Sequence, residues 1–341
     1  MTAYLSVIKG EFLLTGDERI KQRPVKALVQ ALQTIGAKIE YTEKEGFAPL
    51  TISGNHLSGG EINIRGDISS QFISALMLIA PTLQNGLTII IEGELVSRPY
   101  VAMTVKLMAM FGVEIDWSTN KIIIPPTPYN VSRLQSDKQG NKFIEVEGDW
   151  TAASYWCAIT ALNPGSVIQL NGMKQISIQG DCIAPPLFSF FGVSTEFTDT
   201  GCTLKHNGKF EERFGFDFTD NPDLAQTVAV VVSALKIPCL MNGLKTLRDK
   251  ETNRINALKE HLNKINVKAT EVENDGLFID PSSLNIPAEL SINTYNDHRM
   301  AMAFAPLVLF TDKISIENPM VVNKSYPGFW EDLASAGFKV F

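Results

Sequence analysis

The stretch RPYVAMTVKLMAMFGVEIDW, residues 98–117, contains the pattern that decides the fold. A helical segment runs up to Gly112, and a short segment with alternating apolar residues follows it. Glycine just past a helix readily adopts the left-handed conformation that ends it, and apolar alternation indicates a strand. The stretch therefore predicts a helix, a glycine cap and a strand in that order.

The same order of helix, cap and strand occurs five times along the chain. The copies span residues 23–41, 98–117, 180–197, 251–272 and 326–341. Their cap positions, 71 to 80 residues apart, are Gly36, Gly112, Gly192, Asn266 and Gly337. Asparagine is the usual substitute for glycine at a left-handed position. Self-similarity at a steady period predicts a repeat architecture, and we name these five segments the B helices.

A second, more apolar helix alternates with the B helices. Its copies, which we name the A helices, are residues 66–81, 148–162, 220–235 and 296–310. Each is apolar on nearly every side, which indicates burial, and each has Asp, Asn, Ser or Thr near its start, which indicates a capped N-terminus. We therefore expect α/β packing, with A helices inside and sheets outside.

The polar segment 129–147 separates two groups of repeats. It predicts an incomplete N-terminal repeat domain at 1–146 and a C-terminal repeat domain at 147–341, with a strand at 143–147. Residues 1–5 have the character of the last turn of an A helix, and residues 11–16 match the strand that should follow it. We therefore expect the first domain to lack its N-terminal part.

Composition excludes several classes of protein. The net charge of −7 disfavours nucleic-acid binding, and no apolar run reaches the roughly 18 residues that a membrane span needs. The N-terminus has no signal-peptide pattern. Four cysteines at spacings that suggest neither a zinc site nor a disulfide framework are typical of a cytoplasmic protein: Cys157, Cys182, Cys202 and Cys239. We expect no metal, no nucleic-acid partner and no membrane association.

Basic residues gather at the predicted helix starts. They are Arg19, Lys21, Arg23, Arg98, Arg248, Lys250, Arg254, His298, Arg299 and Lys324. Cations oppose the helix dipole there, and an anionic ligand would offset that cost. Two carboxylates nearby, Asp223 and Glu251, are candidates for proton transfer. The pattern predicts an enzyme for anionic, phosphorylated small molecules and leaves the reaction open.

Each of these features also has an ordinary structural explanation. Glu251 and Arg254 could form a solvated i,i+3 ion pair, and Lys324 could be a solvated lysine. Asp297 could be a helix cap followed by exposed charges, Asp223 a first-turn carboxylate, and residues 69–71 a cap. Their placement at equivalent ends of the repeat favours a shared binding cleft instead.

Six segments together resemble the EPSP synthases, block by block and in order. They are TGDERIKQRPVKALVQAL (15–32), GDISSQFISALMLIAP (66–81), LVSRPYVAMTVKLMAMFGVEI (95–115), TLRDKETNRINAL (246–258), YNDHRMAMAFA (295–305) and NKSYPGFWEDL (323–333). The resemblance implies an inside-out α/β barrel fold with two domains of repeated βαβαββ units that close around ligands. It implies transfer of the enolpyruvyl group of phosphoenolpyruvate to the 5-hydroxyl of shikimate 3-phosphate, with release of phosphate and no cofactor. This reaction belongs to the shikimate pathway of chorismate and aromatic amino-acid biosynthesis.

The resemblance also implies roles for individual residues. Asp223 matches the group that takes the hydroxyl proton, and Glu251 the group that protonates the methylene carbon. The shikimate 3-phosphate contacts match Ser69, Ser70, Gln71, Ser97, Asp223 and Lys250. The phosphoenolpyruvate contacts match Arg23, Gln71, Arg254, Arg299 and Lys324. His298 and Tyr100 are expected to line the site, and the enzyme is expected to be a monomer.

Some family features are missing, which keeps two alternatives open. The family's upstream lysine–serine–arginine segment is absent, Thr246 stands where many members have a sugar-binding asparagine, and Asn253 replaces a usual aspartate. One alternative is a truncated, inactive fragment with residual anion binding. The other is a UDP-N-acetylglucosamine enolpyruvyltransferase-like enzyme, although such enzymes carry a loop cysteine that would align near residues 17–21, where this chain has none.

Overall fold

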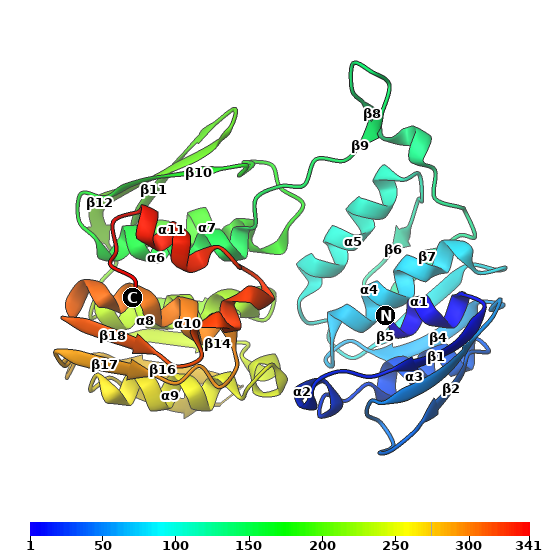
Figure 1. The fold of residues 1–341 in the computed structure, drawn as a ribbon, viewed down its shortest axis with the longest axis horizontal. Helices are drawn as coiled ribbons and strands as arrows, with labels where there is room; N and C mark the ends of the chain where they lie inside the picture. The colour runs from blue at the N-terminus through cyan, green and yellow to red at the C-terminus, as the bar shows by residue number, and fades with distance from the viewer. Residues whose placement is uncertain (274) are drawn as a thin grey trace. The chain divides into compact units, whose positions relative to one another are not determined.

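The chain divides into two compact units. A computed structural model describes residues 1–273 and 275–341 (Figure 1). Unit 1 comprises Met1–Val146 and unit 2 comprises Glu147–Phe341. Each unit has its own cluster of buried apolar side chains, so each has the hydrophobic core that a domain needs.

Unit 1 contains three small sheets and the helices that cover them. In chain order its elements are α1 (Thr2–Val7), β1 (Gly10–Leu14), α2 (Glu18–Lys21), α3 (Lys26–Thr34), β2 (Lys38–Tyr41), β3 (Leu50–Gly54), β4 (Gly60–Arg65), α4 (Ser70–Ile79), η1 (Ala80–Thr82), β5 (Leu87–Glu92), α5 (Arg98–Met110), β6 (Asp116–Trp117), β7 (Lys121–Ile124), η2 (Val131–Arg133), β8 (Gln135–Ser136) and β9 (Lys142–Phe143). The sheet orders are β1-β3-β2, β4-β5-β7-β6 and β8-β9.

Unit 2 is built in the same way. Its elements are α6 (Trp150–Leu162), β10 (Val167–Asn171), η3 (Gly180–Ile183), α7 (Ala184–Ser189), β11 (Phe191–Thr198), β12 (Gly201–Phe210), β13 (Phe214–Asp217), η4 (Pro222–Leu224), α8 (Ala225–Ala234), β14 (Cys239–Asn242), η5 (Lys245–Asp249), α9 (Arg254–Lys264), β15 (Lys268–Val272), β16 (Gly276–Asp280), β17 (Glu289–Ile292), α10 (His298–Phe304), η6 (Ala305–Phe310), β18 (Lys313–Ile316), η7 (Pro319–Lys324) and α11 (Phe329–Ser335). The sheet orders are β10-β12-β11, β13-β14-β16-β15 and β17-β18.

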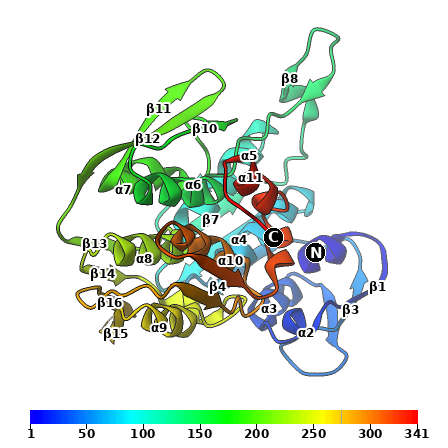
Figure 2. The same cartoon turned by 60° about the vertical axis from the view of Figure 1, so that its left-hand side comes forward.

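The sheets confirm the repeat. In both four-stranded sheets the first two strands are parallel and the remaining pairs are antiparallel. Each such sheet, with its two helices, is one βαβαββ unit, and Figure 2 shows β13, β14, β16 and β15 lying in this order. The two three-stranded sheets have the same order without the first strand. The predicted α/β fold of repeated βαβαββ units is therefore confirmed.

The A helices form the interior of unit 2. Of the 13 residues of α6, 11 are buried, and all ten residues of α8 are buried. Helices α6, α8 and α10 contact one another, and Figure 1 shows the sheets of the unit around them. The β-branched run of α8 has modest helix propensity, so burial rather than propensity holds it helical. Across the described part of the chain, no helix combines the length and hydropathy needed to cross a membrane.

All five predicted cap positions have left-handed backbones, but only four of them follow a helix end: Gly192 lies within β11, where the pairing with β12 is irregular. The φ angles are +98° at Gly36, +83° at Gly112, +80° at Gly192, +56° at Asn266 and +98° at Gly337. The predictions of a helical turn at residues 1–5 and of a strand at 11–16 match α1 and β1. The predicted helix caps are therefore confirmed at Gly36, Gly112, Asn266 and Gly337, and the cap predicted at Gly192 is wrong.

Three other local predictions are wrong. Side-chain caps form at Asp149 and Asp297, but not at Ser69 or Asn221. The Asn221 amide donates to the Gly180 carbonyl and the Asp181 carboxylate instead, and the 3-10 turn η4 precedes α8. The strand predicted at 143–147 is reduced to β9, which pairs with β8 over two residues, and no strand follows α11.

The cap at Asn266 provides a test of the repeat. Because Asn266 is exposed and left-handed, Asn266→Ala should destabilise unit 2 by about 1 kcal/mol, a fall in Tm of roughly 2–4 °C. Asn266→Gly is the matched control and should lose much less, since glycine adopts this conformation without strain. Thermal unfolding of the three proteins measures the difference. Equal losses would show that the Asn266 side chain, not its backbone, supports the cap.

Candidate active site

Arg254 is the centre of a buried ion-pair network in unit 2. It is the first residue of α9, and its side chain is 1% exposed. Its Nε donates to Asp297 Oδ2 at 2.7 Å, its Nη1 to Asp223 Oδ1 at 3.0 Å and its Nη2 to Glu251 Oε2 at 2.8 Å. Burial acts to lower the pKa of Arg254, but Asp297 and Asp223 raise it above its ordinary value. The guanidinium therefore stays charged inside the protein, and the solvated pair considered above is excluded.

Asp223 accepts hydrogen bonds from both arginines of the cluster, Arg254 and Arg299. It lies in η4, and its second oxygen accepts from Arg299 Nη2 at 2.8 Å, while Lys250 Nζ is 3.7 Å from the first. Burial acts to raise the pKa of Asp223, but Arg299, Lys250 and Arg254 together hold it well below its ordinary range. Asp223 is thus ionised at neutral pH, and it gains basicity only if these cations turn to another anion.

The start of α10 supplies Arg299 and His298. Asp297 caps this helix by accepting from the Arg299 backbone N–H at 2.9 Å. The Arg299 side chain also donates to the Tyr155 hydroxyl at 3.4 Å, and burial raises the pKa of Tyr155 to about 12, so that hydroxyl stays protonated. Burial and the Arg299 charge lower the pKa of His298, which makes its imidazole neutral near neutral pH. The charges that follow the Asp297 cap are therefore largely enclosed, not exposed.

Lys324 lies beside the same helix start. Its Nζ donates to the backbone carbonyl of Asn296 at 2.7 Å. Tyr295 and Asn296 both have left-handed backbones, with φ of +51° and +58°, in the turn before α10. Non-glycine residues seldom adopt this conformation, and it often marks functional sites. Unit 2 thus brings together Asp223, Lys250, Glu251, Arg254, His298, Arg299 and Lys324.

Two departures from the family pattern also lie in unit 2. Asn253 caps α9, because its side chain accepts from the Asn256 N–H at 3.1 Å. Asparagine therefore keeps the capping function of an aspartate at this position. Thr246 lies in η5, and its hydroxyl oxygen is buried.

The serines predicted in unit 1 share one edge of a sheet. β4 and β5 are parallel neighbours, so the segments that follow them leave the same edge. Ser69, Ser70 and Gln71 follow β4 at the start of α4, and Ser97 follows β5 immediately before α5. The two helices are joined by a hydrogen bond of 2.8 Å between Ser74 and Thr104.

Backbone contacts hold the two loops of this edge together. Gly66 donates to Glu92 at 2.9 Å, and Val96 donates back to Gly66 at 3.3 Å. Ser97 is left-handed, with φ of +56°, and its carbonyl accepts from the Tyr100 N–H. Ser97 and Tyr100 are therefore placed by the same turn.

Arg23 lies elsewhere in unit 1. It occupies the turn between α2 and α3, where its backbone N–H donates to the Ile20 carbonyl, and it is half-buried. The structure does not bring it into hydrogen-bond contact with the serines of the sheet edge. Residues 17–21, where the rival family would carry a cysteine, form the Asp17-capped helix α2.

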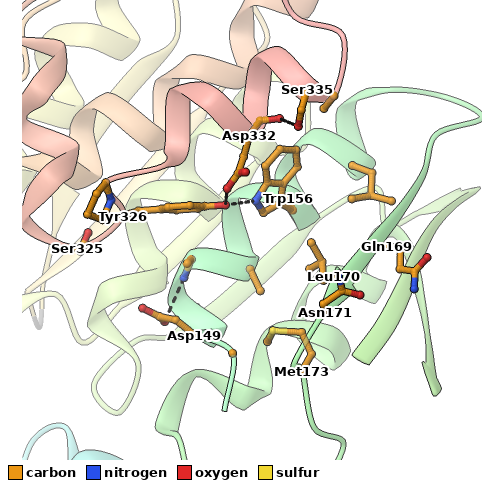
Figure 3. A pocket seen from close by; sticks show the side chains of 16 residues that line it. Asp149, Trp156, Gln169, Leu170, Asn171, Met173, Ser325, Tyr326, Asp332 and Ser335 are labelled. Atoms are coloured by element: carbon orange, nitrogen blue, oxygen red, sulfur yellow. Dashed lines mark hydrogen bonds between the residues drawn. The ribbon is translucent and has the colours of Figure 1, made fainter. Parts of the chain in front are cut away.

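A separate cavity of about 630 Å³ opens in unit 2 between α6, β10 and the segment leading into α11. Figure 3 shows Trp156 donating to the Tyr326 hydroxyl, which donates in turn to Asp332. The lining contains no arginine or lysine. The positively charged side chains that an anion needs are therefore in the Arg254 cluster, and this cavity offers none. Within residues 1–273 and 275–341, no group of three His, Cys, Asp or Glu side chains is placed to hold a metal ion.

Comparison with solved structures identifies the fold. An EPSP synthase from Acinetobacter baumannii superposes with a TM-score of 0.73 at 20% identity, over 100% of this chain and 77% of that one. The enolpyruvyl transferase NikO from Streptomyces tendae superposes with a TM-score of 0.69 at 15% identity, over 96% and 73%. The fold is that of the enolpyruvyl transferases.

Sequence comparison gives the family within this class. The profile of the EPSP synthases, or 3-phosphoshikimate 1-carboxyvinyltransferases, matches residues 1–333. A 3-phosphoshikimate 1-carboxyvinyltransferase of Bacteroides fragilis is 45% identical over all 341 residues, which cover 81% of that relative. The chain belongs to the EPSP synthase family, and it is a carboxyvinyl transferase of the shikimate pathway.

Two residues of the network were not predicted as site residues. Asp297 was interpreted only as a helix cap, although a carboxylate between a left-handed turn and His298-Arg299 could have suggested an arginine partner. Tyr155 lies in the middle of the apolar helix α6, where nothing in the local sequence distinguishes it from a core residue.

The lowered pKa of Asp223 predicts how stability depends on pH. Its folded pKa lies below the unfolded value of about 3.9, so its stabilisation is complete above that value and is lost as the pH falls through it toward the folded pKa. Asp223→Asn should therefore be less stable than the parent at pH 7, and the difference in stability should begin to narrow as the pH falls below about 4. Urea unfolding at a series of pH values measures this gap. The exposed Asp312→Asn is the control, and a gap for Asp223→Asn that stayed constant with pH would contradict the assignment.

Proposed function

We propose that this chain transfers the enolpyruvyl group of phosphoenolpyruvate to the 5-hydroxyl of shikimate 3-phosphate and releases phosphate. The observation that supports this most is the pairing of two enclosed arginines, Arg254 and Arg299, with the carboxylate of Asp223 in a member of the EPSP synthase family. The cluster combines cations for an anionic substrate with carboxylates for proton transfer. We further propose that the enzyme acts as a cytoplasmic monomer without a cofactor.

Phosphoenolpyruvate is assigned to Arg254, Arg299 and Lys324 in unit 2, and to Arg23 and Gln71 in unit 1. Guanidinium groups bind carboxylate and phosphate oxygens through two parallel hydrogen bonds, and an enclosed site strengthens each bond. The Nη atoms of Arg254 donate to Asp223 and Glu251, and Arg299 Nη2 donates to Asp223. To bind these arginines, the substrate must therefore replace Asp223 and Glu251 as the acceptor of their N–H hydrogen bonds.

Shikimate 3-phosphate is assigned to Ser69, Ser70, Gln71 and Ser97, and to Lys250 and Asp223. The serines lie at the starts of α4 and α5, where free backbone N–H groups and the helix dipole favour phosphate. Asp223 would accept a hydrogen bond from the 5-hydroxyl of shikimate 3-phosphate, and Lys250, 3.7 Å from that carboxylate, would offset negative charge beside it.

The proposed reaction is an addition followed by an elimination. Protonated Glu251 gives its proton to the methylene carbon of phosphoenolpyruvate as the 5-hydroxyl oxygen attacks C2, and Asp223 takes the hydroxyl proton. The resulting tetrahedral intermediate then returns a proton from its new methyl group to the Glu251 carboxylate, the electrons of that C–H bond form the new C=C bond, and the C2–O bond to phosphate breaks, so phosphate leaves. When Arg299 and Arg254 turn to the substrate anion, the pKa of Asp223 rises from its lowered value, so substrate binding makes it a better base.

An assay of phosphate release tests the function directly. The chain should release one phosphate for each phosphoenolpyruvate consumed when shikimate 3-phosphate is present, and none when it is omitted. Release that required UDP-N-acetylglucosamine would favour the rival transferase. If neither acceptor supported turnover, while phosphoenolpyruvate still raised the Tm, the chain would be an anion-binding protein without this activity.

Substitution separates the acid from the substrate clamp. Glu251→Gln should lower kcat by roughly 100-fold or more with little change in KM for phosphoenolpyruvate, because it removes a proton donor and keeps the shape of the side chain. Arg299→Ala is the contrasting variant and should chiefly raise KM for phosphoenolpyruvate. Steady-state kinetics with each substrate varied in turn measures both effects. An unchanged kcat in Glu251→Gln would refute the acid role.

A further inference from the structure

We propose that Asp297 is the positioning residue of the phosphoenolpyruvate clamp, holding the Arg254 guanidinium and the Arg299 backbone in one fixed arrangement. The inference rests on the proposed function, because it assumes that these two arginines bind the substrate anion. Asp297 itself touches no substrate in this proposal and acts only through the arginines.

Asp297 uses both of its oxygens to join two helix starts. Oδ2 accepts from Arg254 Nε at 2.7 Å, while Oδ1 accepts from Arg254 Nη2 at 3.4 Å and from the Arg299 N–H at 2.9 Å. Arg254 begins α9 and Arg299 is the second residue of α10. A single carboxylate therefore fixes the position of one arginine relative to the other.

The three carboxylates around Arg254 differ in accessibility. The side chain of Asp297 is 0% exposed, whereas those of Asp223 and Glu251 are 19% and 24% exposed. A ligand arriving from solvent can displace the two accessible carboxylates, but it cannot reach Asp297. Because Asp297 holds Nε, the guanidinium keeps its Nη edge, where Asp223 and Glu251 bind, turned toward exchangeable partners.

Asp297 also helps to keep the Arg254 guanidinium positively charged. Burial, and to a smaller extent Arg299, act to lower the pKa of Arg254, and Asp297 is the strongest influence that raises it. When the substrate displaces Asp223 and Glu251, Asp297 remains as the one protein carboxylate of the three still paired with the guanidinium. The arginine can then stay charged and oriented throughout binding, which is the preorganisation that a clamp needs.

Asp297→Asn separates positioning from helix capping. Asparagine caps helices as well as aspartate, so the Arg299 N–H keeps its acceptor. Its amide N–H group, however, faces the N–H donors of Arg254, and the guanidinium loses its anchor. We expect KM for phosphoenolpyruvate to rise by about 100-fold, with KM for shikimate 3-phosphate changed by less than about 3-fold.

Asp280→Asn is the matched control. Asp280 also accepts from a backbone N–H two residues ahead, that of Ser282 at 3.0 Å, and its Oδ1 serves a turn. This variant should leave both KM values unchanged. The proposal is overturned if Asp297→Asn folds with an unchanged KM for phosphoenolpyruvate, or if it raises both KM values equally.

A double-mutant cycle with Arg254→Gln covers the case in which Asp297→Asn alone does not fold. Removing both partners leaves no unpaired buried charge, so the double variant should fold and should have the kinetics of Arg254→Gln alone. A further loss of activity in the double variant, or its failure to fold while Arg254→Gln folds, would show that Asp297 acts independently of Arg254. A parent protein without turnover would refute the proposed function, whereas the outcomes above refute only the positioning role of Asp297.

Discussion

The buried guanidinium of Arg254 is the interaction on which the chemistry of unit 2 depends. A charge with 1% of its side chain exposed is tolerated only because three carboxylates surround it. Breaking one member of such a group typically costs about 3–5 kcal/mol, so the network fixes the starts of η4, α9 and α10 together. The same arrangement that makes this charge tolerable also brings carboxylates and cationic side chains together in one place.

The repeat explains why these groups meet. In each four-stranded sheet an A helix follows the first strand and a B helix follows the second, and these two strands are parallel neighbours, as β13 and β14 are, so both segments leave the same sheet edge. In unit 1 the same relation between β4 and β5 places Ser69 near the turn of Ser97. The sheet order therefore decides where polar side chains gather, and the sequence at the helix starts decides what they bind.

The sequence was sufficient for the repeat but not for the network. Helix caps depend on local backbone conformation, so Gly36, Gly112 and Asn266 could be assigned from the pattern alone. The i,i+3 spacing of Glu251 and Arg254 correctly predicts an ion pair, yet nothing in the spacing tells how deeply Arg254 is enclosed. That enclosure depends on α8 and α10, which are distant along the chain. The substrate contacts expected of the residues in both units remain predictions.

The turn before α10 has a consequence for which residues position 296 tolerates. Lys324 binds the main-chain carbonyl of Asn296, so the contact itself is indifferent to the side chain at 296. The backbone does restrict the residue at 296, because its left-handed φ of +58° favours asparagine, aspartate or glycine over branched residues. Two constraints therefore act at position 296: its left-handed backbone, and the hydrogen bond that the Asn296 Oδ1 accepts from Asn318 Nδ2 at 2.6 Å. Asparagine meets both, while glycine would meet only the first.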